Sequence, residues 1–155
     1  MKQYGRLLGT PEANAFSARV LDIHEFLVRA PLRSHVGALA IRLAYHDACQ
    51  LRHGQGIAES PRELLRRIPG VELVELPPEA GACCGAPGIY NIAQPDAALA
   101  LATRQAQAVI ASGAEMVVSG DHACIGQLER RLHALGQPIA VHHPIELLAR
   151  AISAG

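Results

Sequence analysis

Aromatic residues are scarce in this chain of 155 residues. Only 3% of the sequence is Phe, Tyr or Trp, and tryptophan is absent. Half of the residues are nevertheless apolar, so the core must be built from Ala, Leu, Ile and Val. A chain of this length can bury a core of its own without disulfides, and it is most simply organised around one such core.

An excess of positive charge is also missing. Lys and Arg number 14, as do Asp and Glu, which gives a formal net charge of zero. Proteins that bind nucleic acids typically show a basic stripe and aromatic side chains on which bases stack. Neither is visible here, and the arginine-containing runs 62–70 and 129–136 are typical of solvated helix faces. We therefore expect no nucleic-acid partner.

The sequence also lacks long hydrophobic runs. No stretch is long enough to span a membrane, and residues 1–16 do not contain the apolar core of a signal peptide. We therefore expect a cytoplasmic protein, associated with a membrane only through a complex. In that reducing compartment, the four cysteines of the chain are more typical of metal ligands or redox groups than of structural disulfides.

Short apolar runs alternate with helical patterns. We expect helices over 11–29, 61–68, 94–114, 124–136 and 144–155, and strands over 38–46, 71–76, 115–120 and 138–143. Ser60 is the expected N-cap of the second helix, with Glu63 completing a capping box. Because a helix lies between successive strands, the pattern predicts an α/β fold. We expect a four-stranded, mostly parallel sheet flanked by helices in Rossmann-like layers.

Each cysteine follows one of these strands. Cys49 comes after the first, Cys83 and Cys84 after the second, and Cys124 after the third. The carboxyl ends of parallel strands share one edge, which is where open α/β folds bind ligands. A single cysteine of this kind is more often a small buried apolar residue. Four at strand ends favour a site in which the thiols converge.

The adjacent pair lies in the segment "GACCGAPG" at 81–88. Successive side chains of an extended chain point apart, and structural zinc sites space their cysteines by two to four residues. An adjacent pair suits an iron–sulfur cluster, in which two sulfurs can reach separate irons. Gly85 and Gly88 allow a sharp bend that brings backbone amides near the sulfurs. A redox-active vicinal disulfide, as in a thiol–disulfide enzyme, is the alternative.

Four segments carry a resemblance to a known family: "YHDACQLRHGQGI" (45–57), "PRELLRRIPGVELVEL" (61–76), "CCGAPGIYNIAQP" (83–95) and "HPIELLARAI" (143–152). In order and spacing they resemble the cysteine-rich CCG domain found in heterodisulfide reductase, in lactate-utilisation proteins and in the glycolate oxidase iron–sulfur subunit, most closely the last. The resemblance covers essentially the whole chain. It implies an electron-transfer domain that relays electrons from a flavin-containing oxidase subunit acting on glycolate or another 2-hydroxy acid, with no catalysis by the domain alone.

The resemblance also implies a ligand set. Cys49, Cys83, Cys84 and Cys124 fall on cluster-ligand positions, whereas Asp121 stands where the first cysteine of a C-x-x-C element would be. Four thiols match an ordinary [4Fe–4S] cluster. Zinc matches them as well if aspartate or histidine is a further ligand, and it would give a metal-stabilised interaction domain without a redox role.

Five further residues are expected around the ligands without binding the metal themselves: His46, His53, Gly85, His122 and His142. Each lies within the resembling motifs or at the same strand ends. For the histidines, ordinary packing is an equal alternative.

The start of the chain resembles a connector. Residues 1–37 are similar to the end of a preceding CCG domain, and residues 38–155 are similar to the CCG domain itself. The resemblance therefore implies the C-terminal half of a longer iron–sulfur subunit. The missing N-terminal half is then an expected partner, and a homodimer of this chain is the alternative.

Overall fold

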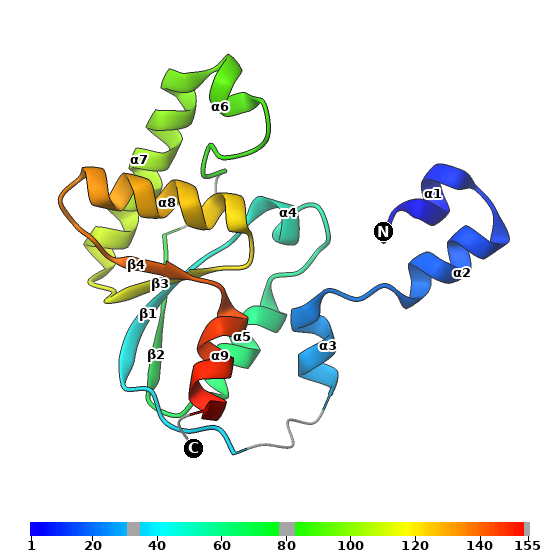
Figure 1. The fold of residues 1–155 in the computed structure, drawn as a ribbon, viewed down its shortest axis with the longest axis horizontal. Coiled ribbons are helices and arrows are strands. Elements are labelled where there is room, and N and C mark those ends of the chain that lie inside the picture. The colour runs from blue at the N-terminus through cyan, green and yellow to red at the C-terminus, as the bar shows by residue number, and fades with distance from the viewer. Residues whose placement is uncertain (31–34, 78–82, 154–155) are drawn as a thin grey trace. The chain divides into compact units, whose positions relative to one another are not determined.

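The computed structural model describes residues 1–30, 35–77 and 83–153, and the chain divides into two compact units, 1–32 and 33–155. The first unit contains the helices α1 (Tyr4–Leu8), α2 (Pro11–Arg19) and α3 (Ile23–Arg29) (Figure 1). Within it, the rings of Tyr4 and Phe16 stack with their centroids 6.0 Å apart, which joins α1 to α2.

The single helix expected over residues 11–29 is wrong, because the chain is extended between α2 and α3. Asp22 has φ −72° and ψ 153°, and it is the N-cap of α3. Its side chain accepts a hydrogen bond from the His24 amide at 2.9 Å, while Glu25 accepts one from the Asp22 amide at 3.0 Å. This capping box starts a new helix, although the apolar spacing continues across the break.

The second unit is built on a parallel sheet, as predicted. Its strands are β1 (Ile41–His46), β2 (Val71–Glu75), β3 (Met116–Ser119) and β4 (Ala140–His142), in the order β2-β1-β3-β4. β1 pairs in parallel with β2 and β3, and β3 pairs in parallel with β4. All four expected strands are present and slightly shorter than expected. The fold class is therefore confirmed as α/β with a four-stranded parallel sheet.

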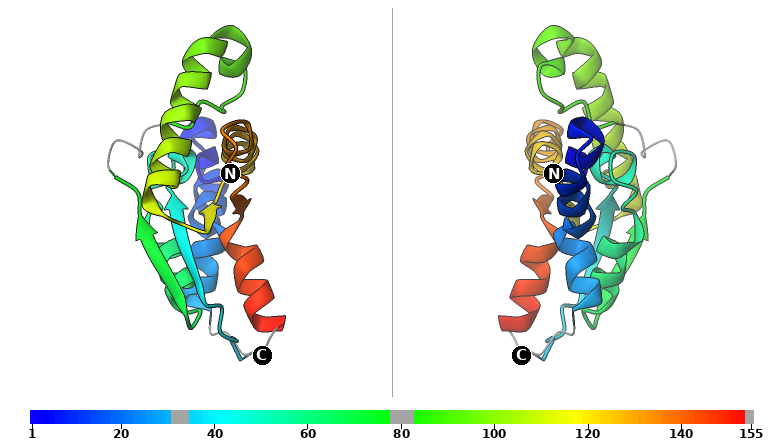
Figure 2. Two further views of the ribbon diagram at one scale, coloured as in Figure 1. Left: turned by 90° about the vertical axis from the view of Figure 1, so that its left-hand side faces the viewer. Right: turned by 90° about the vertical axis from the view of Figure 1, so that its right-hand side faces the viewer.

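Six helices connect or follow these strands in the described part of the unit: α4 (Cys49–Arg52), α5 (Glu59–Arg66), α6 (Tyr90–Ala93), α7 (Pro95–Ser112), α8 (His122–Ala134) and α9 (Pro144–Ser153). α5 packs against α9, and α7 packs against α8. Right-handed crossovers place these two pairs on opposite faces of the sheet. The upper half of α7 projects beyond the strands together with α6 (Figures 1 and 2).

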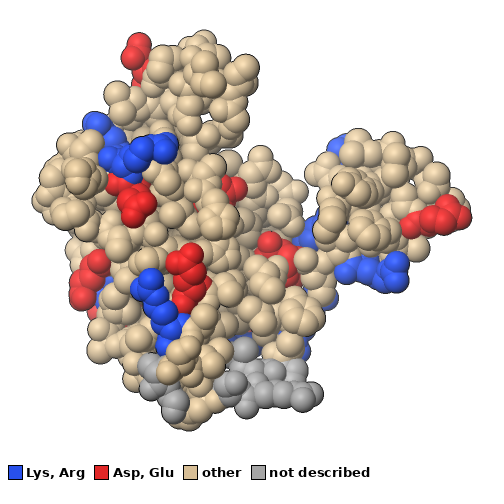
Figure 3. Space-filling view, viewed as in Figure 1, with Lys and Arg blue, Asp and Glu red and all other residues tan. Residues whose placement is uncertain are grey.

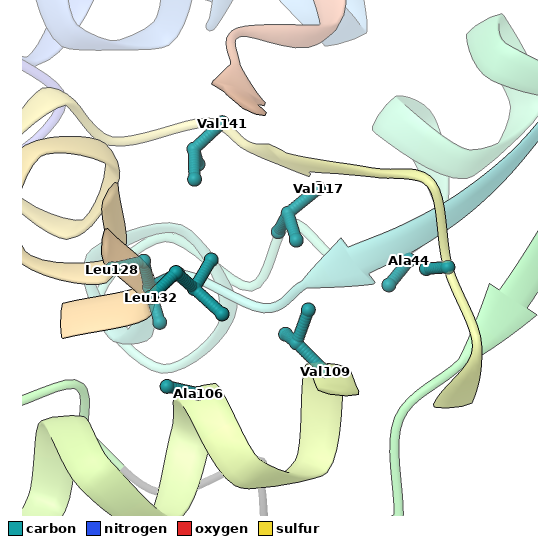
Figure 4. Close-up of a cluster of buried hydrophobic side chains, with 8 residues drawn as sticks. Ala44, Ala106, Val109, Val117, Leu128, Leu132 and Val141 are labelled. Atoms are coloured by element: carbon teal, nitrogen blue, oxygen red, sulfur yellow. The ribbon is translucent and has the colours of Figure 1, made fainter. Parts of the chain in front are cut away.

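One layer of the core lies between the sheet and the α7–α8 pair. Ala44, Val117 and Val141 are register partners across β1, β3 and β4, and all are buried. Val109 of α7 and Leu128 of α8 pack against this row (Figure 4). Because side chains alternate along a strand, the residues two positions beyond this row point to the same face, which determines where the site forms.

Two helix starts differ from the expectation. α5 begins at Glu59 with Ala58 as its N-cap, so the N-cap assigned to Ser60 is wrong. The start of α5 is instead fixed by Arg62, whose Nη1 donates to the Ala58 carbonyl at 2.7 Å. α8 begins two residues earlier than expected, because Asp121 caps it. The short helices α1, α4 and α6 were not expected, since single turns leave no periodic pattern.

The distribution of surface charge and the hydropathy of the helices agree with what the composition predicts. Acidic and basic side chains are interspersed on the face seen in Figure 3, with no stripe of one sign. In the part of the chain that the structure describes, no helix combines the length and apolar character needed to cross a bilayer.

Candidate metal centre

All four cysteines lie at the carboxyl edge of the sheet. Cys49 is the first residue of α4, Cys124 is in the first turn of α8, and Cys83 and Cys84 precede α6. The Sγ atoms of Cys84 and Cys124 are 2.8 Å apart, and all four cysteines are free. Three segments far apart in sequence therefore bring thiols to one place, as the strand ends predicted.

The two adjacent cysteines contact different partners. Cys84 is buried against Cys124, whereas Cys83 is half-buried and lies beside Cys49. Neighbouring side chains thus point apart, as expected for an extended segment. The structure contains no vicinal disulfide, because both sulfurs are free thiols.

The thiols perturb one another's pKa values. Burial raises the pKa of Cys49, and the neighbouring Cys83 and Cys84 thiols raise it further. The hydrogen bond between Cys84 and Cys124 lowers the pKa of Cys84 to about 7, and the same bond raises the pKa of Cys124. The lowered pKa favours the thiolate form of Cys84 over that of Cys124. Thiolate is the form that binds a metal.

The loop after the pair directs backbone amides at the sulfurs. The Gly85 amide donates to Cys83 Sγ at 3.4 Å, and the Ala86 amide donates to Cys84. This confirms the expectation that a glycine-containing bend brings backbone amides near the sulfurs. Gly85 also needs its small size, because its φ is +77° and a Cβ there would lie 2.5 Å from the carbonyl oxygen of Ala98 in α7. Residues 78–82 of the same loop lie outside the described residues.

We expect Gly85→Ala to destabilise the protein and displace the cysteine pair. Positive φ alone costs an alanine about 1–2 kcal/mol, and at Gly85 the clash with α7 adds to it. Gly88→Ala is the matched control, since Gly88 also has a positive φ of 46° but open space around it. Urea unfolding of both variants without metal measures the difference. Equal losses of unfolding free energy would mean that the close approach to α7 is unimportant.

His46 approaches the Cys84–Cys124 pair from β1. It is 1% exposed, and its Nδ1 lies 3.1 Å from the hydroxyl of Ser119 on β3. The ligand atoms of His46, Cys84 and Cys124 lie within 4.8 Å of one another. Burial lowers the pKa of His46 to about 4, although the charges of Asp47 and Asp121 act in the opposite direction. The imidazole is therefore neutral at pH 7.

Asp47 lies two residues before Cys49 and accepts hydrogen bonds from two arginines, Arg52 of α4 and Arg62 of α5. Arg62 of α5 donates from Nη1 and Nη2 to the two carboxylate oxygens of Asp47, at 2.9 and 2.8 Å, and its guanidinium lies 4.6 Å from the ring centroid of Tyr45. Burial by itself would raise the pKa of Asp47, but the hydrogen bonds and charge of Arg62 hold it below its ordinary value. Arg62 and Ser119 were not expected from the sequence, because only strand register and helix packing bring them close to the site.

Asp121 lines the same cavity as the thiols. This cavity, of about 220 Å³, is also lined by Cys49, Cys84 and Cys124. Asp121 Oδ1 accepts hydrogen bonds from the amides of Ala123 and Cys124, at 2.8 and 3.2 Å. It therefore fixes the first turn of α8, in which Cys124 lies. Its role as a metal ligand stays a prediction.

The other three histidines make contacts away from the thiols. His53 lines a separate cavity together with Asp47 and Arg62. His122 stacks on His143 with the ring centroids 5.9 Å apart, and Nδ1 of His142 lies 2.9 Å from Glu146 Oε2. The structure places His46 and the Gly85 amide beside the sulfurs, and the supporting roles of all five residues stay predictions.

The chain is similar to known proteins over most of its length. The chain is 29% identical over 143 residues to lactate utilization protein A of Exiguobacterium sp., covering 92% of this chain and 58% of that protein. It is 30% identical over 145 residues to lactate utilization protein A of Lysinibacillus sphaericus, covering 93% and 63%. One subunit of the fumarate reductase (CoM/CoB) of Methanothermobacter marburgensis is 33% identical over 135 residues, which are 86% of this chain and 27% of that protein.

The chain thus spans about three-fifths of the length of these lactate utilization proteins. Residues 43–129, more than half of the chain, match the model of the CCG cysteine-rich domain, and this range contains all four cysteines, His46 and Asp121. The chain therefore belongs to the CCG cysteine-rich domain family.

Proposed function

We propose that this domain holds an iron–sulfur cluster through Cys49, Cys83, Cys84 and Cys124 and transfers electrons through it. The observation that carries this proposal is the convergence of four free thiols, from three separate segments, on one edge of the sheet. If the cysteines formed structural disulfides, these sulfurs would be bonded to one another. If they were ordinary core residues, they would not be expected to lie together at one edge of the sheet.

The donor set suits such a cluster. Iron–sulfur clusters are bound by cysteine thiolates, and their potentials depend on burial and on hydrogen bonds to sulfur. Here Cys84 and Cys124 are buried, while Cys49 and Cys83 are half-buried. When bound, a [4Fe–4S] cluster accepts and releases single electrons. The chain itself supplies thiolates, shields them from water and directs the amides of Gly85 and Ala86 at the sulfurs.

At the level of the whole protein, we propose a role in the oxidation of a 2-hydroxy acid, with glycolate as the substrate favoured by the sequence motifs. Two similar proteins are named for lactate utilization, and a third is named as part of a fumarate reductase. The electron donor would be a flavin-containing subunit. The domain would act in the cytoplasm, joined to an N-terminal half of which residues 1–37 are the connector, and it would not be catalytic alone.

Zinc is the second candidate, and one observation favours it. The ligand atoms of His46, Cys84 and Cys124 are within 4.8 Å of one another, which is close enough for a single ion. A zinc site would stabilise the edge of the sheet for docking a partner, without any change of redox state.

Metal analysis of anaerobically purified and reconstituted protein tests the proposal. We expect about four irons and about four acid-labile sulfides per chain, with an electron paramagnetic resonance signal after reduction, as for a [4Fe–4S] centre. One zinc per chain, without labile sulfide and with no uptake of iron during reconstitution, would overturn the redox function in favour of the zinc site.

A further inference from the structure

We infer that His46 is itself a metal ligand of this centre, binding through Nε2 beside the Sγ atoms of Cys84 and Cys124. The inference assumes from the proposed function only that these thiols hold a metal. It goes beyond that function because it assigns His46 direct contact with the metal, as a nitrogen ligand beside the sulfurs of Cys84 and Cys124.

The register of the sheet places His46 in the site. His46 is the last residue of β1, two positions after Ala44, and it pairs with Ser119 at the end of β3. Side chains two positions apart point to the same face. Ala44 faces the α7–α8 core, so His46 faces the start of α8, where Cys124 lies.

The second ring nitrogen of His46, Nδ1, has a hydrogen-bond partner of the kind that metal-binding histidines have. Such histidines usually donate their second ring N–H to a nearby acceptor, which fixes the tautomer and the orientation of the ring. Ser119 is completely buried, and its hydroxyl lies 3.1 Å from His46 Nδ1. With Nδ1–H donating to Ser119, Nε2 carries the lone pair that a metal requires.

Nε2 has no partner of its own among residues 1–30, 35–77 and 83–153, although it is buried. Buried polar atoms are almost always satisfied, and an exception calls for a ligand, an ion or water. The sulfurs of Cys84 and Cys124 lie beside the ring, since one ring nitrogen of His46 and the two Sγ atoms are within 4.8 Å of one another. A metal ion between them would satisfy Nε2 and both thiolates together.

Asp121 is the competing non-sulfur ligand. Its Oδ1 accepts two amide hydrogen bonds in the first turn of α8, which commits that oxygen to the helix start and leaves Oδ2 for a metal. The buried and unsatisfied Nε2 nevertheless favours His46.

X-ray absorption of the full chain loaded with zinc alone tests the inference. For the unaltered protein we expect a mixed shell, with nitrogen at about 2.0–2.1 Å and sulfur at about 2.3 Å, together with outer scattering from one imidazole ring. In His46→Gln the imidazole scattering should disappear and the zinc affinity should fall at least tenfold, about the loss seen when even a supporting partner is removed.

Two further variants make the test specific. His53→Gln is the matched control, because His53 lies outside the thiol cavity and should keep both scattering and affinity. Ser119→Ala should keep the imidazole scattering but weaken zinc binding by about 10–100-fold. Unchanged affinity in Ser119→Ala would contradict the orienting role of Ser119. Circular dichroism checks the fold of each variant. The X-ray absorption spectrum of the unaltered chain tests the inference even if a variant fails to fold.

The outcomes separate this inference from the proposed function. An all-sulfur shell, an imidazole signal that persists in His46→Gln, or no zinc binding at all would overturn the inference. If zinc shows the imidazole but iron and sulfide never assemble, His46 remains a ligand and the redox function fails. If the cluster assembles but the zinc shell contains only sulfur, the redox function stands and the inference fails.

Discussion

Replacement of Cys84 by serine should abolish the iron–sulfur centre. Cys84 is 1% exposed and contacts Cys124, and its pKa is lowered to about 7, which favours the thiolate form that binds iron. A serine hydroxyl stays protonated at neutral pH and is a poor ligand for iron. After anaerobic reconstitution we expect iron, labile sulfide and visible absorbance to fall at least about tenfold.

Ala86→Ser provides the control for this experiment. Ala86 is buried in the wall of the cavity that Cys49, Cys84 and Cys124 line. The change therefore adds a hydroxyl to this cavity without removing a sulfur. Its cluster content should stay close to that of the unaltered chain. Serine variants of Cys49, Cys83 and Cys124 should behave like Cys84→Ser if all four are ligands. Full cluster occupancy in Cys84→Ser would rule out the ligand set proposed here.

The sheet and its edge could be predicted because the relevant signals are local. Each short apolar run is followed by a helical pattern, and parallel strands connected by helices must end at one edge. The strands at 41–46 and 116–119 follow from this rule, as does the meeting of Cys49 with Cys124. No knowledge of side-chain contacts was needed.

The contacts that complete the site depend on register and packing, which a linear pattern does not contain. His46 faces Ser119 because β1 and β3 pair with one particular offset. Arg62 reaches Asp47 because α5 packs on the face of the sheet opposite α8.

The starts of two helices were also not predicted correctly, because they too depend on contacts that the linear pattern does not contain. Asp121 begins α8 through two backbone amides, and any nearby Ser, Asp or Thr was an equally plausible cap from the sequence.

Arg62→Met is expected to cause a large loss of stability. Arg62 and Asp47 are both buried, and two parallel hydrogen bonds join them. Methionine preserves much of the apolar stem but leaves the Asp47 carboxylate buried without its main partner. Removal of one member of a buried ion pair typically costs about 3–5 kcal/mol. Urea unfolding of the metal-free protein, followed by circular dichroism, measures this loss against a total stability of about 5–15 kcal/mol.

Arg66→Met is the matched control, four residues along the same helix. Arg66 lies 3.6 Å from Glu59, and both side chains are more than half exposed, so its loss should cost no more than about 1 kcal/mol. Adding Asp47→Asn to Arg62→Met should recover part of the stability, because the buried carboxylate, left with Arg52 alone, is then replaced by a neutral amide. Equal losses in the two arginine variants would show that Arg62 does not hold the turn before Cys49. If it does hold that turn, the cluster content of Arg62→Met should fall as well, since Asp47 is two residues from Cys49.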